Sequence, residues 1–164
     1  MERNGGHDDN GIVWPEAIAP YRVCVVPIGG GKSAAGQYLQ QKAKELCRHL
    51  EDNIDVIDGD DILLEDRSHR VSPGMKLKEA SLIGFPWVVV LGKTALPESK
   101  DVWEDEQGLD QYLVGGGGGT VEIQERATGM SVQVPYGEVG DYFKHHARCR
   151  TPVELLNEGF ELFD

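Results

Sequence analysis

Apolar and polar positions repeat with two different periods in the first half of the chain, and together they predict alternating strands and helices. Residues 22–28 (RVCVVPI) form an almost continuous apolar run, which is typical of a strand buried on both faces. A second strand follows within 54–64, where the run at 62–64 is favoured over a competing run at 54–57. Between these strands, helical spacing predicts a helix that buries Ala35, Tyr38, Leu39, Ala43, Leu46, Cys47 and Leu50.

Cap residues place the next helix, and an apolar run places the strand after it. Ser72 is a preferred N-cap residue and Pro73 fits the first helical position, so a short helix is predicted to begin here and to end at Gly84. The apolar run 86–92 (PWVVVLG) is the third predicted strand. This order of short apolar strands and helices indicates a largely parallel sheet that is covered on both faces.

The pattern changes to a hairpin after the glycine run at 115–119. Apolar residues alternate with polar ones on two arms, 120–125 and 131–135. A helix is predicted over 136–146, and capping residues with an apolar stripe predict a last helix within 148–164. The predicted fold is therefore α/β, with a mixed, mainly parallel sheet of about five strands and helices on both faces.

Charge narrows the choice of partners. The 164 residues include 16 Lys and Arg against 28 Asp and Glu, a net charge of −12. This balance argues against an extended nucleic-acid surface, because phosphate neutralisation normally supplies most of that affinity. Residues 65–78 nevertheless carry four Lys or Arg against two acids, whereas residues 98–111 carry six acids against one Lys. A bound polyanion would lie at 65–78, although a solvated charged loop explains the pattern equally well.

Signals for other ligands are weak. The order of a strand, glycines, Lys32, Ser33 and a helix is that of a P-loop, but the spacing puts Val26 where the first glycine belongs. A loose connection between strand and helix is therefore favoured. The three cysteines form no CxxC pair, which predicts neither a zinc site nor a disulfide framework. No cofactor is expected in this chain, and no apolar run approaches the length of a membrane span.

Two sequence blocks in combination carry a family resemblance. They are G-I-V-W-P-x-x-I-A-P-Y at 11–21, and D-R, S-P-G-x-K and L-I-G-x-P within 66–86. With them the chain resembles the C-terminal anticodon-binding domain of class II aminoacyl-tRNA synthetases, most closely that of bacterial-type prolyl-tRNA synthetase. The resemblance covers residues 7–93 well and the hairpin and helix after 120 more loosely.

The resemblance implies a domain organisation and a division of labour. Residues 1–20 would be the joint from a catalytic core absent from this chain. Residues 21–147 would be the anticodon-binding domain, with an acidic and glycine-rich insertion at 97–119, and residues 148–164 a C-terminal helix. ATP and magnesium would belong to the missing core, so the chain alone is expected not to activate proline.

The residue types at 65–78 suit the anticodon reading that the resemblance implies. Unpaired bases expose their Watson–Crick edges. Asp66 can accept hydrogen bonds from N1–H and the amino group of guanine, and Arg67 can donate to guanine O6 and N7 or to phosphate. Lysines on the first turns of the helix after Pro73 can meet phosphates. The predicted tRNA-binding residues are Glu65, Asp66, Arg67, Arg70, Lys76 and Lys78.

Each assignment has a structural alternative. Asp66 and Arg67 could form an ion pair or a turn cap at a strand end, and the lysines could simply be solvated. Glu65 stands where family members have Asp, and Ser81 replaces a frequent acid. Both departures bear on individual contacts rather than on the domain.

Two classes of function remain open. The first is an anticodon-reading module whose partner is proline tRNA, in a parent synthetase that forms a homodimer in the cytoplasm, a mitochondrion or a plastid. Neither a membrane nor DNA is an expected partner. The second is an accessory protein that reuses this fold for protein contacts. Retention of Asp66, Arg67 and Lys76 favours the first class, and the net charge of −12 with the acidic insertion favours the second.

Overall fold

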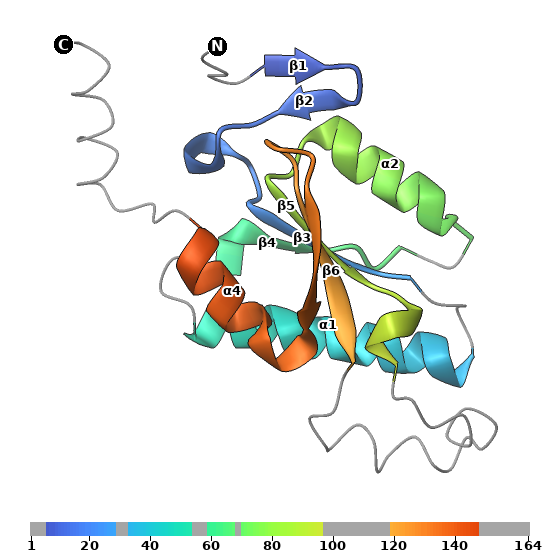
Figure 1. Ribbon diagram of the computed structural model, residues 1–164. Helices are drawn as coiled ribbons and strands as arrows, with labels where there is room; N and C mark the ends of the chain where they lie inside the picture. Colours follow the sequence, from blue (N-terminus) through green and yellow to red (C-terminus); the bar gives the residue numbers. More distant parts are fainter. Residues whose placement is uncertain (1–5, 29–32, 54–58, 68–69, 97–118, 148–164) are drawn as a thin grey trace.

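A five-stranded mixed sheet runs through the part of the chain that the computed structural model describes, residues 6–28, 33–53, 59–67, 70–96 and 119–147 (Figure 1). Its strand order is β4-β3-β5-β6-β7. The strands are β3 (Val23–Pro27), β4 (Ile62–Leu64), β5 (Trp87–Leu91), β6 (Thr120–Glu125) and β7 (Ser131–Pro135). β3 pairs in parallel with both β4 and β5, whereas the β6–β7 hairpin adds antiparallel to β5. The predicted α/β fold with five strands is confirmed, and the parallel part is limited to the strands before the hairpin.

Helices cover both faces of the sheet, as predicted. α1 (Ala34–Asn53) and α4 (Val139–His146) lie on one face and α2 (Pro73–Ile83) lies on the other (Figure 1). Successive residues of a strand point to opposite faces. Val23 and Val25 of β3 therefore join the core with α1 and α4, while Cys24 and Val26 join the smaller core under α2.

The predicted caps of α2 are also observed. The Ser72 hydroxyl accepts a hydrogen bond from the Met75 amide at 3.2 Å, and Pro73 occupies the first helical position. Gly84 ends the helix in the left-handed conformation, with φ of 84°. The chain then enters β5 directly, so α2 is fixed at both ends.

The β6–β7 hairpin has one buried and one polar face. Val121, Ile123 and Val134 are buried in the core with α1 and α4. By alternation, Gln124 of β6 and Ser131 of β7 face the α2 side. Among the described elements, α2 packs on the strands before the hairpin, so the polar face of the hairpin lies beside the helix (Figure 1).

The N-terminal segment contains structure that the sequence pattern did not predict. A small hairpin of β1 (Gly6–Asp8) and β2 (Gly11–Val13) precedes the 3₁₀ helix η1 (Glu16–Ile18). The hairpin packs on the end of α2, where the Trp14 indole nitrogen donates to the Ile83 carbonyl at 2.9 Å. Strands of three residues are too short to show a period, which explains why this segment was expected only as a joint.

A buried arginine ties this segment to the sheet. The Arg22 side chain is fully buried and forms ion pairs with Glu16 of η1 at 2.6 Å and with Asp61 at 3.6 Å. Asp61 closes the 3₁₀ helix η2 (Gly59–Asp61), which leads into β4. Two further 3₁₀ helices, η3 (Lys93–Ala95) and η6 (Tyr136–Glu138), follow β5 and β7. The start of the sheet is thus fastened by charge pairs as well as by apolar contacts.

Several predictions fall outside the described residues. They are the glycines at 29–31 with Lys32, the competing strand at 54–57, most of the insertion (97–118) and the C-terminal helix at 148–164. Val26, where a P-loop would need its first glycine, lies buried within β3. Within the described residues, no three His, Cys, Asp or Glu side chains are grouped to hold a metal ion. The same part of the chain has no helix with the length and apolarity that a bilayer crossing requires.

Candidate nucleic-acid interface

Residues 65–67 leave the sheet at the edge where its parallel strands end. The Glu65 amide donates to the Val25 carbonyl at 2.9 Å, so the pairing of β3 with β4 extends one residue beyond β4. β4 and β5 lie on opposite sides of β3, which makes this edge the place where the strand order reverses. Ligands of open α/β sheets bind at this kind of edge.

Arg67 is held by two carboxylates. Its Nε donates to both carboxylate oxygens of Glu65, at 2.8 and 2.9 Å, and its Nη2 donates to Oε2 of Glu65 at 2.6 Å. Its Nη1 forms an ion pair with Glu79 of α2. The ion pair that the sequence left open as an alternative is therefore present, but the carboxylates belong to Glu65 and Glu79 rather than to Asp66.

These contacts shift the proton affinities of the paired groups. The hydrogen bond from Arg67 holds the pKa of Glu65 below its usual value, and the bonds that Arg67 donates to Glu65 and Glu79 raise the pKa of Arg67. The Arg67 side chain is still 44% exposed. One N–H on each terminal nitrogen of the guanidinium is not used by these carboxylates, so Arg67 keeps donors for a ligand.

The sequence predicted that Lys76 lies on the surface and contacts phosphate, but the structure buries it. The residue is 5% exposed, and its ammonium donates to the Arg67 carbonyl at 2.7 Å. The sequence could not show this contact, because the carbonyl belongs to a turn nine residues earlier whose course depends on the sheet. Lys76 therefore lies beneath residues 65–67 and supports them.

The other predicted residues face solvent. Asp66, Arg70 and Lys78 are exposed. No hydrogen bond or ion pair from the described residues reaches the Asp66 carboxylate or the Lys78 ammonium. The structure thus brings together Glu65, Arg67 and Lys76 as one network and leaves Asp66 at its outer side.

Glu79 is a member of this network that the sequence analysis missed. It lies one helical turn after Lys76, at the i, i+3 spacing. An acid at this spacing from a lysine normally signals a pair along the helix. Here its partner is Arg67, which precedes the helix.

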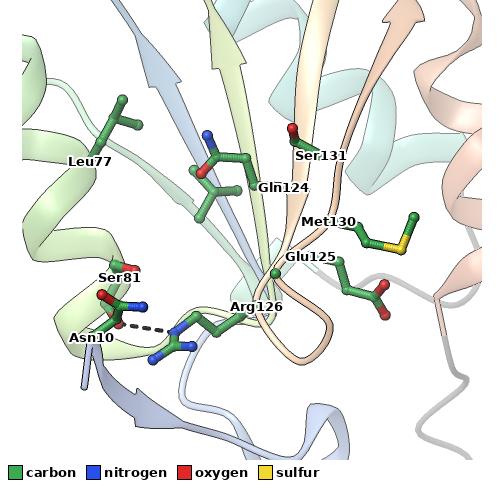
Figure 2. Close-up of a pocket in the computed structure, with 10 residues that line it drawn as sticks. Asn10, Leu77, Ser81, Gln124, Glu125, Arg126, Met130 and Ser131 are labelled. Carbon is green, nitrogen blue, oxygen red and sulfur yellow. Dashed lines mark hydrogen bonds between the residues drawn. The ribbon is translucent and has the colours of Figure 1, made fainter. Parts of the chain in front are cut away.

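A concave site separate from residues 65–67 lies beside the C-terminal half of α2. It is a pocket of about 290 Å³ between α2, the β6–β7 turn and the turn of the N-terminal hairpin, and Figure 2 shows its side chains. Its polar lining includes Asn10, Ser81, Gln124 and Arg126.

Arg126 builds the wall of this pocket. Its guanidinium makes two hydrogen bonds to the Asp8 carboxylate, at 2.6 and 2.7 Å, and Nε donates to the Ser81 carbonyl at 3.3 Å. Figure 2 shows this last bond reaching from the β6–β7 turn to α2. Because its side chain is only 10% exposed and its charge is paired with Asp8, Arg126 joins three elements instead of offering a cation to a ligand. A lone arginine at a hairpin turn gave no signal of this role in the sequence.

Comparison with known proteins agrees with this architecture. Residues 22–146 match the family model of the anticodon binding domain. The protein named "Proline--tRNA ligase" of Francisella tularensis subsp. holarctica (strain FTNF002-00 / FTA) is 42% identical over 106 residues, and that of Francisella philomiragia subsp. philomiragia is 41% identical over 106 residues. Each match covers 65% of this chain and 15% of the relative, so the chain spans a small part of these relatives' length. The chain belongs to the anticodon-binding domain family of class II aminoacyl-tRNA synthetases and is related to prolyl-tRNA synthetase.

Proposed function

We propose that this chain binds the anticodon loop of proline tRNA and reads its bases at the edge formed by residues 65–78. The family implies tRNA binding, and the curated relatives named above are proline--tRNA ligases. The observation that carries the proposal is the exposed Asp66 carboxylate, which lies between two residues held in place by hydrogen bonds. Because the backbone around Asp66 is already fixed, only its side chain has to be ordered when a base binds.

Asp66 and Arg67 have the chemistry to read guanine. The Asp66 carboxylate can accept hydrogen bonds from N1–H and from the exocyclic amino group of guanine at once. No other base presents this pair of adjacent donors on its Watson–Crick edge. The N–H donors that Arg67 retains can reach O6 and N7 of a base or a phosphate oxygen. Arg70 and Lys78 are exposed cations suited to the RNA backbone.

The proposal assigns no catalysis to this chain. ATP and magnesium would be held by a catalytic core, as the family resemblance implies. The isolated chain is therefore expected to show no proline-dependent exchange of pyrophosphate with ATP. Measurable exchange by the purified chain would contradict this part of the proposal.

Replacing Asp66 tests the reading of bases. Asp66→Ala should weaken binding of a proline anticodon stem-loop by about 1–3 kcal/mol and leave a stem-loop with substituted guanines nearly unchanged, because a base-edge contact matters only where the base is present. Fluorescence anisotropy at low salt measures both affinities. Asp60→Ala is the matched control, since Asp60 is also exposed but lies before β4, at the other end of the strand.

The result separates the two classes of function. Equal loss on both stem-loops would show that Asp66 does not read a base. If wild-type chain bound neither stem-loop, the accessory protein would become the better description. The net charge of −12 is the observation that favours an accessory protein, because it opposes binding of RNA.

A further inference from the structure

We propose that Lys76 is a positioning residue, which holds the turn at 65–67 so that Asp66 faces the RNA, and that it makes no contact with phosphate. This inference rests on the proposed function. It reverses the expectation from the sequence, in which Lys76 was one of the cations that meet the RNA backbone.

Burial is the first observation that carries the inference. Lys76 is 5% exposed, whereas Lys78, two residues later on the same helix, is exposed. A buried ammonium is stable only when hydrogen bonds and nearby negative charge replace the water that it has lost. The Arg67 carbonyl accepts a hydrogen bond from the Lys76 ammonium at 2.7 Å, and the Lys76 charge contributes to the lowered pKa of Glu65, after the larger effect of the hydrogen bond from Arg67.

The second observation is that three hydrogen bonds fix the backbone on both sides of Asp66. The Glu65 amide donates to the Val25 carbonyl at 2.9 Å. The Arg67 amide donates to the Glu65 carboxylate at 3.0 Å, and the Arg67 carbonyl accepts from Lys76. Of these bonds, only the one from Lys76 joins the turn to α2 through a buried group.

Reaching a phosphate would break this arrangement. The ammonium would have to leave the Arg67 carbonyl and move out of a buried site, which would leave that carbonyl without its donor. Lys78 needs no such change, because its ammonium is already in solvent. The two lysines are therefore a matched pair that separates positioning from direct contact.

The test replaces each lysine by methionine, which has a similar length and no charge. Lys76→Met should lower the affinity for a proline anticodon stem-loop about 5- to 150-fold, spare a stem-loop with substituted guanines, and keep the salt dependence. Lys78→Met should weaken both stem-loops and reduce the log-log salt slope by about 0.7. Lys76→Arg, which keeps a donor at this position, should recover part of the discrimination. A loss of about 0.7 in slope with equal weakening of both RNAs in Lys76→Met would overturn the proposal.

Measurements on the free protein test the positioning role of Lys76 separately from the proposed binding of an anticodon. In the free protein, hydrogen exchange at the Arg67 amide should be faster in Lys76→Met than in wild type and unchanged in Lys78→Met. Unchanged exchange in Lys76→Met would overturn the positioning role whether or not the chain reads an anticodon. If wild type showed no discrimination while exchange responded as expected, the proposed function alone would fail.

The wild-type chain supplies a last check that does not depend on a variant's folding. An amine-acetylating reagent should label Lys78 in the free protein, and RNA should protect it. Lys76 should remain unlabelled in both states. Labelling of Lys76 that RNA suppresses would identify it as a phosphate contact and overturn the proposal.

Discussion

Gly84 shows how one residue fixes the junction between α2 and the N-terminal hairpin. Its φ of 84° lies in the left-handed region, and a β-carbon there would collide with the backbone of Ile12. Gly84→Ala should therefore destabilise the chain by about 2 kcal/mol or more, because backbone strain and a clash act together. Urea unfolding followed by circular dichroism measures the change.

Gly74→Ala is the matched control for this substitution. Gly74 lies in the first turn of α2, where a β-carbon would meet no atom within 4 Å. Alanine in a helix is favoured over glycine by about 0.5–1 kcal/mol, so this variant should be as stable as wild type or more so. If both substitutions had the same effect, the close approach at Gly84 would not be important for stability.

The role of a single residue was predictable from the sequence only where it depends on neighbouring residues of the chain and not on tertiary contacts. The sequence predicted the caps Ser72, Pro73 and Gly84 because their effects depend on a few neighbouring residues. It also placed Asp66 at a strand end. It misplaced Lys76, since the carbonyl that binds its ammonium is brought there by tertiary structure.

At the scale of elements, Arg126 joins the β6–β7 turn to the N-terminal hairpin. Its hydrogen bonds hold the pKa of Asp8 well below its usual value of 3.8. A depressed pKa means that the contact adds stability above the usual value and that this stability is lost as pH falls through the depressed value. Acid should therefore loosen the β1–β2 hairpin well below pH 3.8.

Arg126→Gln tests this contact. Hydrogen exchange at residues 6–13 should become faster by on the order of ten-fold at neutral pH, because the charge-assisted bonds are lost. NMR titration should then find the pKa of Asp8 raised toward its usual value, with the Asn10 amide still holding it somewhat lower. Arg48→Gln, at an exposed position of α1, is the control and should change neither quantity. Wild-type exchange rates in Arg126→Gln would show that apolar packing alone holds the hairpin.

The longer elements were predictable from the sequence, and of the three-residue strands only β4, which is a continuous apolar run, was predicted. The arms of the β6–β7 hairpin were predicted at 120–125 and 131–135, the bounds that β6 and β7 have. Their apolar and polar faces alternate over enough residues to define the period. Gly11 and Gly84 allow the backbone of β2 to approach the end of α2 closely, which hydrophobic spacing cannot show.

At the scale of the whole molecule, the net charge of −12 leaves RNA binding dependent on the few cations at 65–78. Four cationic contacts to single-stranded RNA would give a log-log salt slope of about −3. With Lys76 buried, the exposed cations within the described part of 65–78 are Arg67, Arg70 and Lys78, so we expect a slope of about −2. Titration of a stem-loop at several salt concentrations measures it.

Variants locate the cations that contribute to this slope. Lys78→Ala should reduce it by about 0.7, and Lys44→Ala on α1, at an exposed position on the other face of the sheet, should leave it unchanged. A wild-type slope of about −3 or steeper would mean that cations beyond these three contact the RNA.

The join between η3 and β6 has a consequence for how this domain can change. Gly119 lies against the carbonyl oxygens of Thr94 and Leu96, and the Thr94 hydroxyl donates to the Thr120 carbonyl at 3.0 Å. The chain thus leaves the described fold after Leu96 and re-enters it beside the same residues. Between fixed, adjacent ends, each doubling of a connection's length costs only about 0.6 kcal/mol. A change in the length of 97–118 should therefore cost the sheet little, because both ends of this segment are held at adjacent positions of the described fold.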